Sequence, residues 1–347
     1  MNAHRLRASD LRFLLGLLLP ALTVQSVSQR PQTAGFVALG VLVLIAALEA
    51  FFPALARSPA PLAEGGALRW VLRLFVPLEL ALLAAGATAA MNASWPTLLG
   101  VAIAVGFVTG AQGITFAHEL GHSRHRADRA LGWVLMTLVG YPQFMVEHYR
   151  GHHVRAATWD DPASARPGES LWAFLPRTLA GSLRSAWALE SRQLARVHRG
   201  WGASPLLWAT VAIVAWVLAL ALLGQGKLLA FWLAQSAFAV WLLETVNYIE
   251  HYGLQRRVQA DGRPEPFGVA HAWNADHVLS NSLLANLQRH SDHHVHAWKP
   301  FASLQALPGP QLPTGYSGCI LLASVPPLWF AVMEPRRAGV AAPAAAR

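Results

Sequence analysis

The sequence contains one cysteine, Cys319, in 347 residues. A single thiol cannot form an internal disulfide, and it cannot supply the four thiolates that hold an iron–sulfur cluster or a structural zinc ion. A disulfide-stabilised fold is therefore excluded. Any electron-transfer centre of the iron–sulfur type must belong to another protein.

Charged residues are also scarce, since Asp, Glu, Lys and Arg make up 13% of the chain while hydrophobic residues make up 54%. With a mean hydropathy of +0.36, this composition excludes a disordered chain, a collagen and a compact soluble enzyme. The net charge of +9 could indicate nucleic-acid binding. However, the basic residues lie between apolar runs rather than along one polar face, which is typical of membrane topology. We therefore expect a lipid bilayer, and no nucleic acid, as a partner.

Six apolar stretches approach or reach the roughly 20 residues that cross a bilayer core as a helix. They are 11–28, 33–56, 70–91, 95–117, 204–223 and 228–247. The first follows basic residues and contains Pro20, but no convincing cleavage site follows it, so we interpret it as a retained helix rather than a signal peptide. Two shorter apolar segments, 131–146 and 318–333, are expected to be re-entrant, interfacial or buried within the protein.

The loops predicted on one side of the membrane contain most of the basic residues. These are Arg5, Arg7, Arg12, Arg57, Arg69 and Arg73. The loops on the other side contain only Arg30 and Lys227. Because loops rich in Lys and Arg stay inside, both termini are expected in the cytoplasm of a bacterial-type inner membrane.

We expect a single all-α membrane domain over 1–347, with a disordered tail over 334–347. Its two long polar regions, 118–203 and 248–315, are expected on the cytoplasmic side. They contain all of the 15 histidines except His4. Any metal centre built from these histidines would therefore lie just outside the bilayer, in the cytoplasm.

The histidines form four clusters, at 118–122, 147–153, 247–253 and 287–294. His118 and His122 share one helix face, a spacing that lets both reach one metal ion, and His148 and His152 repeat it. Adjacent histidines such as those at 152 and 153 are about 100° apart on a helix and can serve two different ions. Nine clustered imidazoles suit two metals with four or five ligands each, and iron, copper and zinc all accept such ligands.

Polar residues near these clusters are candidates for supporting roles. Four carboxylates each neighbour a ligand candidate and could fix imidazole tautomers: Glu119, Glu147, Glu250 and Asp292. Glu244 and Asn247 lie near the end of the last predicted span, where polar side chains indicate function or hydrogen bonding between helices. The isolated histidines are interpreted as surface residues rather than ligands. They are His4, His125, His198 and His296.

The motifs, over roughly 116–304 together with the six spans, resemble the integral-membrane non-haem di-iron alkane hydroxylases, or alkane 1-monooxygenases. These belong to the membrane fatty acid desaturase and hydroxylase superfamily. The long third motif, Asn-Tyr-Ile-Glu-His-Tyr-Gly-Leu at 247–254, separates the hydroxylases from the desaturases. The segment His-Ala-Trp-Asn at 271–274 is similar to a further segment of the family.

The resemblance implies nine ligands to two iron ions. They are His118, His122, His148, His152, His153, His251, His290, His293 and His294. It implies structural or ligand-supporting roles for His271, Asn274 and His277. The sequence departs from the family pattern at Ser123, where a basic residue is common, and at 299–301, where Lys-Pro-Phe replaces Arg-x-Tyr.

The activity implied by the resemblance is O2-dependent hydroxylation of the terminal carbon of a medium- or long-chain alkane to a primary alcohol. Electrons would come from rubredoxin with its reductase, or from another iron–sulfur donor. Six arginines offer a cationic surface for an acidic donor, although solvated positive-inside residues are the alternative interpretation. They are Arg124, Arg126, Arg129, Arg150, Arg155 and Arg166.

Three other functions remain open from the sequence. A related oxygenase could act on alkylaromatics such as xylene, or the chain could be a fatty acyl desaturase or hydroxylase. His118-Glu119-x-x-His122 is also the signature of zinc metalloproteases, in which the glutamate is the general base, but that function leaves seven ligand candidates without a role. A metal-binding membrane protein without catalysis is the third possibility.

Overall fold

A computed structural model describes residues 8–62 and 68–341. Within these residues the chain is helical and forms no β-strand, which confirms the all-α prediction. Six helices are long and apolar enough to cross a membrane, as predicted. They are Ser9–Gln29, which comprises η1 (Ala8–Leu14) and α1 (Leu15–Gln29), then α2 (Pro31–Phe51), α3 (Arg69–Asn92), Trp95–Gly121, α10 (Pro205–Leu222) and α11 (Gly226–His251).

The ends of these helices follow from local sequence. Ser94 accepts a hydrogen bond from the backbone N–H of Thr97 (3.4 Å) and caps the helix that begins at Trp95. Helix α2 ends at Phe51, so the prediction that this span continues to residue 56 is wrong. Pro53 follows, and a proline cannot donate the hydrogen bond that would extend the helix.

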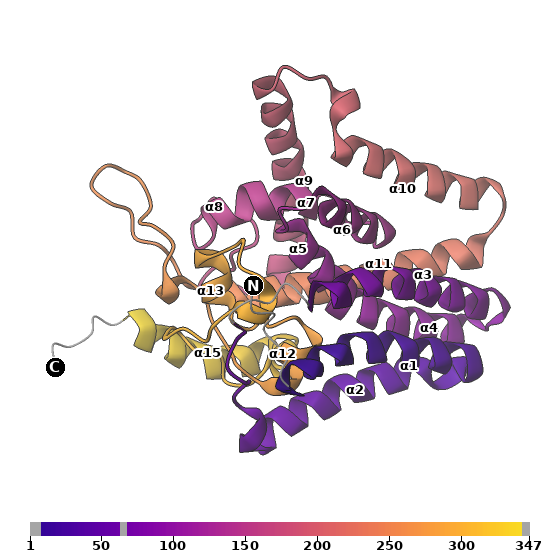
Figure 1. Cartoon of the computed structure of the whole chain (residues 1–347), viewed down its shortest axis with the longest axis horizontal. Helices are drawn as coiled ribbons and strands as arrows, with labels where there is room; N and C mark the ends of the chain where they lie inside the picture. Colours follow the sequence, from indigo (N-terminus) through magenta and orange to yellow (C-terminus); the bar gives the residue numbers. More distant parts are fainter. Residues whose placement is uncertain (1–7, 63–67, 342–347) are drawn as a thin grey trace, which may run out of the picture.

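The central spanning helix, Trp95–Gly121, consists of α4 (Trp95–Val108), the π-helical segment η4 (Thr109–Ile114) and α5 (Thr115–Gly121). It packs between α2 and α11, while α1 packs against α3 (Figure 1). A Cβ atom on Gly106 would lie 2.6 Å from the backbone oxygen of Gln235, and one on Gly110 would lie 2.8 Å from the Cα of Ala239. Only glycine at these positions of α4 and η4 therefore allows the central spanning helix and α11 to approach this closely, as in other membrane helix pairs.

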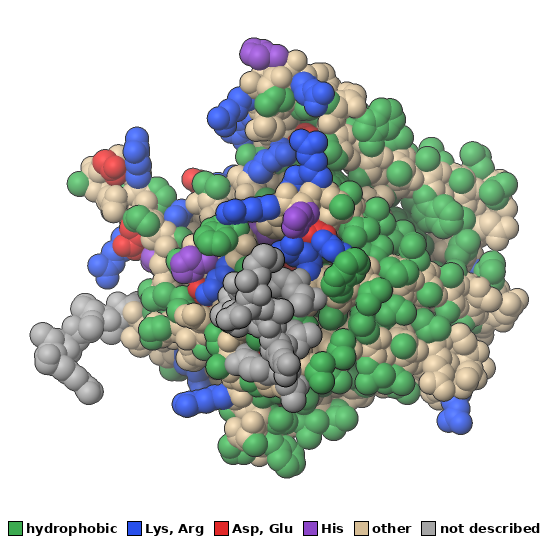
Figure 2. All heavy atoms as spheres, in the orientation of Figure 1, with side chains coloured by type: hydrophobic (Ala, Val, Ile, Leu, Met, Phe, Trp, Pro, Cys, Tyr) green, Lys and Arg blue, Asp and Glu red, His purple; other side chains and the backbone are tan. Residues whose placement is uncertain are grey.

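The remaining helices form a polar cap at one end of this bundle (Figure 1). The α-helices are α6 (Arg126–Leu138), α7 (Phe144–Glu147), α8 (His153–Arg155), α9 (Leu171–Arg196), α12 (Val278–Leu283), α13 (His290–Val295), α14 (Tyr316–Ala323) and α15 (Pro326–Ala341). The π-helical segment η5 (His148–His152) lies between α7 and α8. Four short 3-10 turns complete the set: η2 (Pro53–Leu55), η6 (Trp201–Ala203), η7 (Val269–His271) and η8 (Phe301–Ser303). Figure 2 shows hydrophobic side chains gathered over the bundle, whereas most charged and histidine side chains lie over the cap.

Neither of the two short apolar segments forms a straight spanning helix. Segment 131–146 is divided between α6 and α7. Segment 318–333 is divided between α14 and α15, which are bent by 120° at the break between them. The prediction of a disordered tail is wrong for residues 334–341, because α15 continues to Ala341, and residues 342–347 lie outside the described residues. Glu334 contributes to this order, since it pairs with Arg337 (2.6 Å) and accepts a hydrogen bond from the Tyr252 hydroxyl (2.5 Å).

Candidate metal centre

The histidine motifs lie where the bundle meets the polar cap. Two of them are carried by spanning helices: His118 lies in α5 with His122 directly after its end, and His251 is the last residue of α11. The other two lie in the cap, in the segment from η5 to α8 and in α13. The tight packing of α4 on α11 therefore also holds the first and third motifs next to each other.

All nine predicted ligands converge into two groups, and in each group one ring nitrogen per residue lies within 4.8 Å of all the others. The five-histidine group consists of His118, His122, His148, His153 and His293. The four-histidine group consists of His152, His251, His290 and His294. Of the nine residues, only His122 and His153 are partly exposed.

The π-helical turn η5 changes which histidines face each other. On an α-helix, His148 and His152 would share a face, and this was the sequence prediction. The wider π turn instead brings Nε2 of His148 to 2.9 Å from Nε2 of His153 and leaves His152 in the other group. His148 and His152 repeat the i, i+4 spacing in the sequence but lie in different groups. Single π turns inside helices occur mostly at functional sites.

In α13 the α-helical spacing is kept, so that His290 and His294 share the four-histidine group while His293 joins the other one. The ring Nε2 atoms of His290 and His251 are 3.0 Å apart. Adjacent histidines thus face different groups at 152 and 153 and again at 293 and 294, as helix geometry predicts.

The donor set fits metal ions. Two nitrogens bound at about 2.1 Å to one ion lie roughly 3.0 Å apart when they subtend a right angle. The Nε2 atom of His293 lies 3.0 Å from that of His118 and 3.2 Å from that of His153, and one N–H cannot bridge both contacts. In the other group, Nε2 of His152 and both ring nitrogens of His294 are buried and have no hydrogen-bond partner among the described residues. Such buried polar atoms require a partner, and a metal ion supplies one.

Burial, together with repulsion between neighbouring imidazoles, lowers the pKa of the rings outside the spanning helices well below the ordinary histidine value. These rings are His122, His148, His153, His290, His293 and His294. At neutral pH they are uncharged, which is the form of imidazole that binds metals.

Two of the four predicted carboxylates lie beside ligand candidates. Glu119 lies 3.4 Å from Nδ1 of His118, and Glu250 lies 3.2 Å from Nδ1 of His290. Glu250 also accepts a hydrogen bond from the Tyr316 hydroxyl (2.5 Å). These positions are consistent with carboxylates that orient ligand rings.

The other two predicted carboxylates face elsewhere. Glu147 accepts a hydrogen bond from Arg155 (2.5 Å). Asp292 accepts hydrogen bonds from Lys299 (2.6 Å) and from the isolated His296 (2.7 Å). Both residues therefore stabilise the cap around the histidines, and neither is positioned to fix the tautomer of a ring in the two groups.

Asp161 is the functional candidate that the sequence analysis missed. Its Oδ2 atom is 2.9 Å from Nδ1 of His152 and also accepts a hydrogen bond from Ser164 (2.6 Å). Burial by itself raises the pKa of Asp161, but His152 and Ser164 lower it to about 2, so the side chain is ionised. In the sequence, Asp161 is simply a carboxylate in a polar loop, nine residues after the ligand candidate His152. The adjacent Asp160 has the same sequence surroundings but is exposed, so the sequence could not distinguish the two.

The remaining polar candidates support the fold around the histidines. Glu244 accepts hydrogen bonds from Asn247 (3.2 Å), from Tyr141 (2.7 Å) and from Thr178 in α9 (2.9 Å). Hydrogen bonding between elements of the structure therefore explains why Glu244 and Asn247, two polar residues, occur in this spanning helix. The side-chain oxygen of Asn274 accepts a hydrogen bond from the backbone N–H of Ser291 (2.8 Å). Ser291 directly follows the ligand candidate His290, so this bond holds the start of α13 in place.

The predicted supporting and isolated histidines lie outside the two groups. His271 closes a turn with Gly268 and contacts Glu265 (3.1 Å). His277 precedes α12, and its N–H donates to Gln288 (2.9 Å). His125 and His198 are exposed, as expected for surface residues, and His4 lies outside the described residues.

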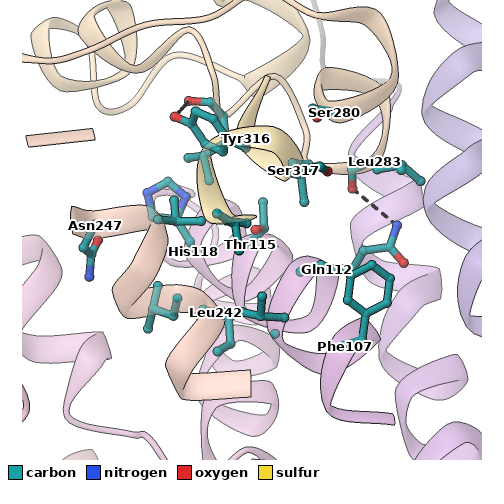
Figure 3. Close-up of a pocket in the computed structure, with 18 of the residues that line it drawn as sticks. Phe107, Gln112, Thr115, His118, Leu242, Asn247, Ser280, Leu283, Tyr316 and Ser317 are labelled. Carbon is teal, nitrogen blue, oxygen red and sulfur yellow. Dashed lines mark hydrogen bonds between the residues drawn. The ribbon is translucent and has the colours of Figure 1, made fainter. Parts of the chain in front are cut away.

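A narrow, largely apolar cavity leads from the bundle to the histidines. Side chains from α1, α2, α4, α11, α12 and α14 line it, and His118, His148 and His290 lie on its wall. Figure 3 shows His118 and Phe107 well apart among the residues around the cavity. Both lie on the central spanning helix, and their separation of 11 positions corresponds to about 16 Å along its axis. Gln112 lies between them and donates a hydrogen bond to the backbone oxygen of Leu283 (3.3 Å).

The comparisons with known proteins agree with the motifs. The chain is 40% identical to an alkane 1-monooxygenase of Pseudomonas putida over 76% of this chain and 66% of that protein. It is 43% identical to alkane 1-monooxygenase 1 of Pseudomonas aeruginosa over 70% of this chain and 64% of that protein. It is 28% identical to a xylene/toluene monooxygenase hydroxylase component of Pseudomonas putida over 67% of this chain and 63% of that protein.

The chain thus spans about two thirds, or slightly less, of the length of the curated relatives it matches. The predicted resemblance to alkane 1-monooxygenases is confirmed. Residues 93–316, more than half of the sequence, match the family described as fatty acid desaturase, and the chain belongs to that family.

Proposed function

We propose that this chain is a membrane monooxygenase that hydroxylates the terminal carbon of medium- or long-chain alkanes to primary alcohols. The observation that carries the proposal is the apolar cavity, which begins among the spanning helices and ends at His118, His148 and His290. The similarity to alkane 1-monooxygenases supports the same reaction.

The two histidine groups would each hold one iron ion, through five and four imidazoles respectively. Bound iron would supply the oxidising power to insert one atom of O2 into a C–H bond, while the other oxygen atom leaves as water after uptake of two electrons and two protons. Asp161 holds His152 by its Nδ1 atom and directs its Nε2 atom into the four-histidine group. Glu250 lies 3.2 Å from Nδ1 of His290 without a hydrogen bond to it.

The apolar cavity would bind the alkane and exclude water. Each buried CH2 group stabilises the bound substrate by about 0.8 kcal/mol, so a chain of about eight carbons gains several kcal/mol. The wall contributed by α4 guides the terminal methyl group toward His118, and Phe107 lies toward the other end of the chain. The walls carry few polar groups, so chain length and shape, rather than hydrogen bonding, would select the substrate.

A second candidate substrate is an alkylaromatic hydrocarbon, which the similarity to a xylene/toluene monooxygenase component favours. The name of the family keeps fatty acyl desaturation as a further alternative. A zinc protease is disfavoured, because a single catalytic zinc ion takes three protein ligands and leaves the four-histidine group without a role.

The electrons would come from a rubredoxin, reduced by its reductase, or from a related iron–sulfur protein, because Cys319 alone cannot hold such a centre. We place the polar cap and both termini in the cytoplasm of a bacterial-type inner membrane, since the loops at that end carry most of the basic residues.

The decisive experiment is conversion of octane, hexadecane and xylene by the chain in lipid nanodiscs, with rubredoxin, its reductase and O2. We expect about two iron ions per chain, in agreement with the two groups, and a primary alcohol whose oxygen derives from labelled O2. An alkene product would indicate a desaturase. One zinc ion per chain without O2 consumption would contradict the proposal.

A further inference from the structure

A shallow pocket on the outside of the polar cap reaches the five-histidine group directly. Its lining includes Arg69, His122, Trp298 and Lys299. His122 is one of the two ligand candidates that are partly exposed, and its Nε2 atom lies 3.4 Å from that of His148. His122 thus faces the other ligand candidates and also lines this surface pocket.

We propose that this pocket and its rim form the docking surface for the electron donor, a small acidic protein that carries a one-electron iron–sulfur centre. The proposal rests on the function proposed above, because only a reaction that consumes electrons requires a donor. His122 would be the point where an electron enters, since it joins the surface to the metal centre through one side chain.

The charges around the pocket are complementary to an acidic partner. Arg124 lies over the lining residue Trp298, and both Arg124 and the nearby Arg126 are exposed. The neighbouring carboxylates are not available at the surface: the Glu119 side chain is only 7% exposed, and Asp128 and Asp292 are buried. Each of the two aspartates is held in an ion pair inside the protein, with Arg73 (2.7 Å) and Lys299 (2.6 Å) respectively. Positive charge therefore dominates the surface, which accelerates association with an acidic protein.

Trp298 provides an apolar contact at the centre of this surface. Its side chain is 64% exposed, and the guanidinium group of Arg124 lies 5.3 Å from the centre of its ring. Exposed aromatic and arginine side chains are the residue types that dominate the binding energy of protein interfaces. Redox complexes are small and transient, and a compact surface of this kind is sufficient for them.

The pocket also brings together the two departures from the family pattern. Ser123 and the segment Lys-Pro-Phe at 299–301 are far apart in the sequence, yet both line it. Ser123 donates a hydrogen bond to Asp128 (2.6 Å), and its backbone oxygen accepts one from Arg129 (2.8 Å).

The face around His153, the other partly exposed residue, is less suitable. The loop 257–265 on that side carries Asp261 and Glu265 as well as Arg257 and Arg263, so its charges are mixed. The other three arginines of the predicted cationic surface are engaged elsewhere. Arg150 pairs with Glu190, Arg155 pairs with Glu147, and Arg166 lies over Trp159.

The test compares three charge reversals of equal size in the full chain in nanodiscs. They are the double variant Arg124→Glu with Arg126→Glu, the control Arg196→Glu with Arg199→Glu on the exposed end of α9, and Arg257→Glu with Arg263→Glu on the rival face. The measurements are binding of a purified rubredoxin and the stopped-flow rate at which it reduces the iron, at low and high salt.

For the first variant we expect association roughly ten-fold slower at low salt, and the difference should shrink as salt screens the charges. Trp298→Ala, which changes no charge, should weaken binding roughly ten-fold at either salt concentration. The control should match the unaltered chain. The proposal would be overturned if only the Arg257→Glu, Arg263→Glu variant on the rival face bound rubredoxin more weakly. It would also be overturned if binding were unaltered in both the first variant and Trp298→Ala.

The docking surface and the proposed reaction can fail separately. If rubredoxin binds and reduces the iron but no alcohol forms from any hydrocarbon, the proposed function is wrong and the docking surface stands. If alcohol forms and the Arg124→Glu, Arg126→Glu chain binds rubredoxin as tightly as the control, the surface is wrong and the function stands.

Discussion

The two histidine groups differ in what surrounds them. The four-histidine group is fully buried, with an ionised Asp161 hydrogen-bonded to His152 and with Glu250 beside His290. The five-histidine group has one more ring and two partly exposed members, and Glu119 lies 3.4 Å from Nδ1 of its His118. One group is therefore held by buried carboxylates and the other by the number of its ligands. The first is suited to retaining its metal, and the second to exchanging electrons with the surface.

The largest effect should follow from removing one ring from each group. His152→Ala and His293→Ala should both abolish hydroxylation, and each should lower the iron content from two ions to about one per chain, because a group that loses a ligand binds its metal weakly. Elemental analysis and product detection measure both effects. The exposed His125→Ala is the control and should keep iron and activity. Full activity in either ligand variant would contradict the assignment.

Asp161→Asn should have the next largest effect, and it should act on the four-histidine group alone. The amide cannot stabilise the His152 tautomer as the carboxylate does, and loss of such a partner lowers metal affinity by about 10–100-fold. Iron titration of the metal-free protein measures this change. Asp160→Asn is the matched control, because the adjacent residue is exposed. Equal affinities in the two variants would remove the proposed distinction between the groups.

Metal removal should separate the groups in time. A water-soluble iron(II) chelator should first remove the ion of the five-histidine group, because His122 and His153 are partly exposed, and only later the buried one. Mössbauer spectra recorded during chelation would show two phases, each accounting for about half of the iron. Loss of both ions in a single phase would mean that the surroundings of the groups do not govern retention.

Tyr316→Phe should have the smallest effect of the series. It removes the hydroxyl group that donates to Glu250 (2.5 Å) but leaves the carboxylate beside His290. One net hydrogen bond contributes about 1 kcal/mol, so the affinity of the four-histidine group for iron should fall about five-fold. The same titration measures it. A loss larger than that of Asp161→Asn would show that Glu250, rather than Asp161, is the main support of this group.

Hydropathy and helix spacing predicted the parts of this molecule that depend on local sequence. The six spans follow from apolar length, and the convergence of nine imidazoles follows from motifs placed at the ends of two spans. The pairing within the second motif could not be predicted, because spacing arguments assume an α-helix and residues 148–152 form a π turn. Asp161 was missed because a loop carboxylate acquires its partner only through the tertiary fold. The sequence left open which of the four neighbouring carboxylates support a ligand, and Glu147 and Asp292 instead bind Arg155 and Lys299, because sequence neighbours of a ligand can point away from it.

The unbroken course of α11, from Gly226 to His251, connects the lipid environment to the chemistry. Its far end lies at the opposite surface of the bundle and its last residue is a member of the four-histidine group. A spanning helix adjusts its tilt to the thickness of the surrounding bilayer. We therefore expect bilayer thickness to act on the position of His251 without any change in the protein.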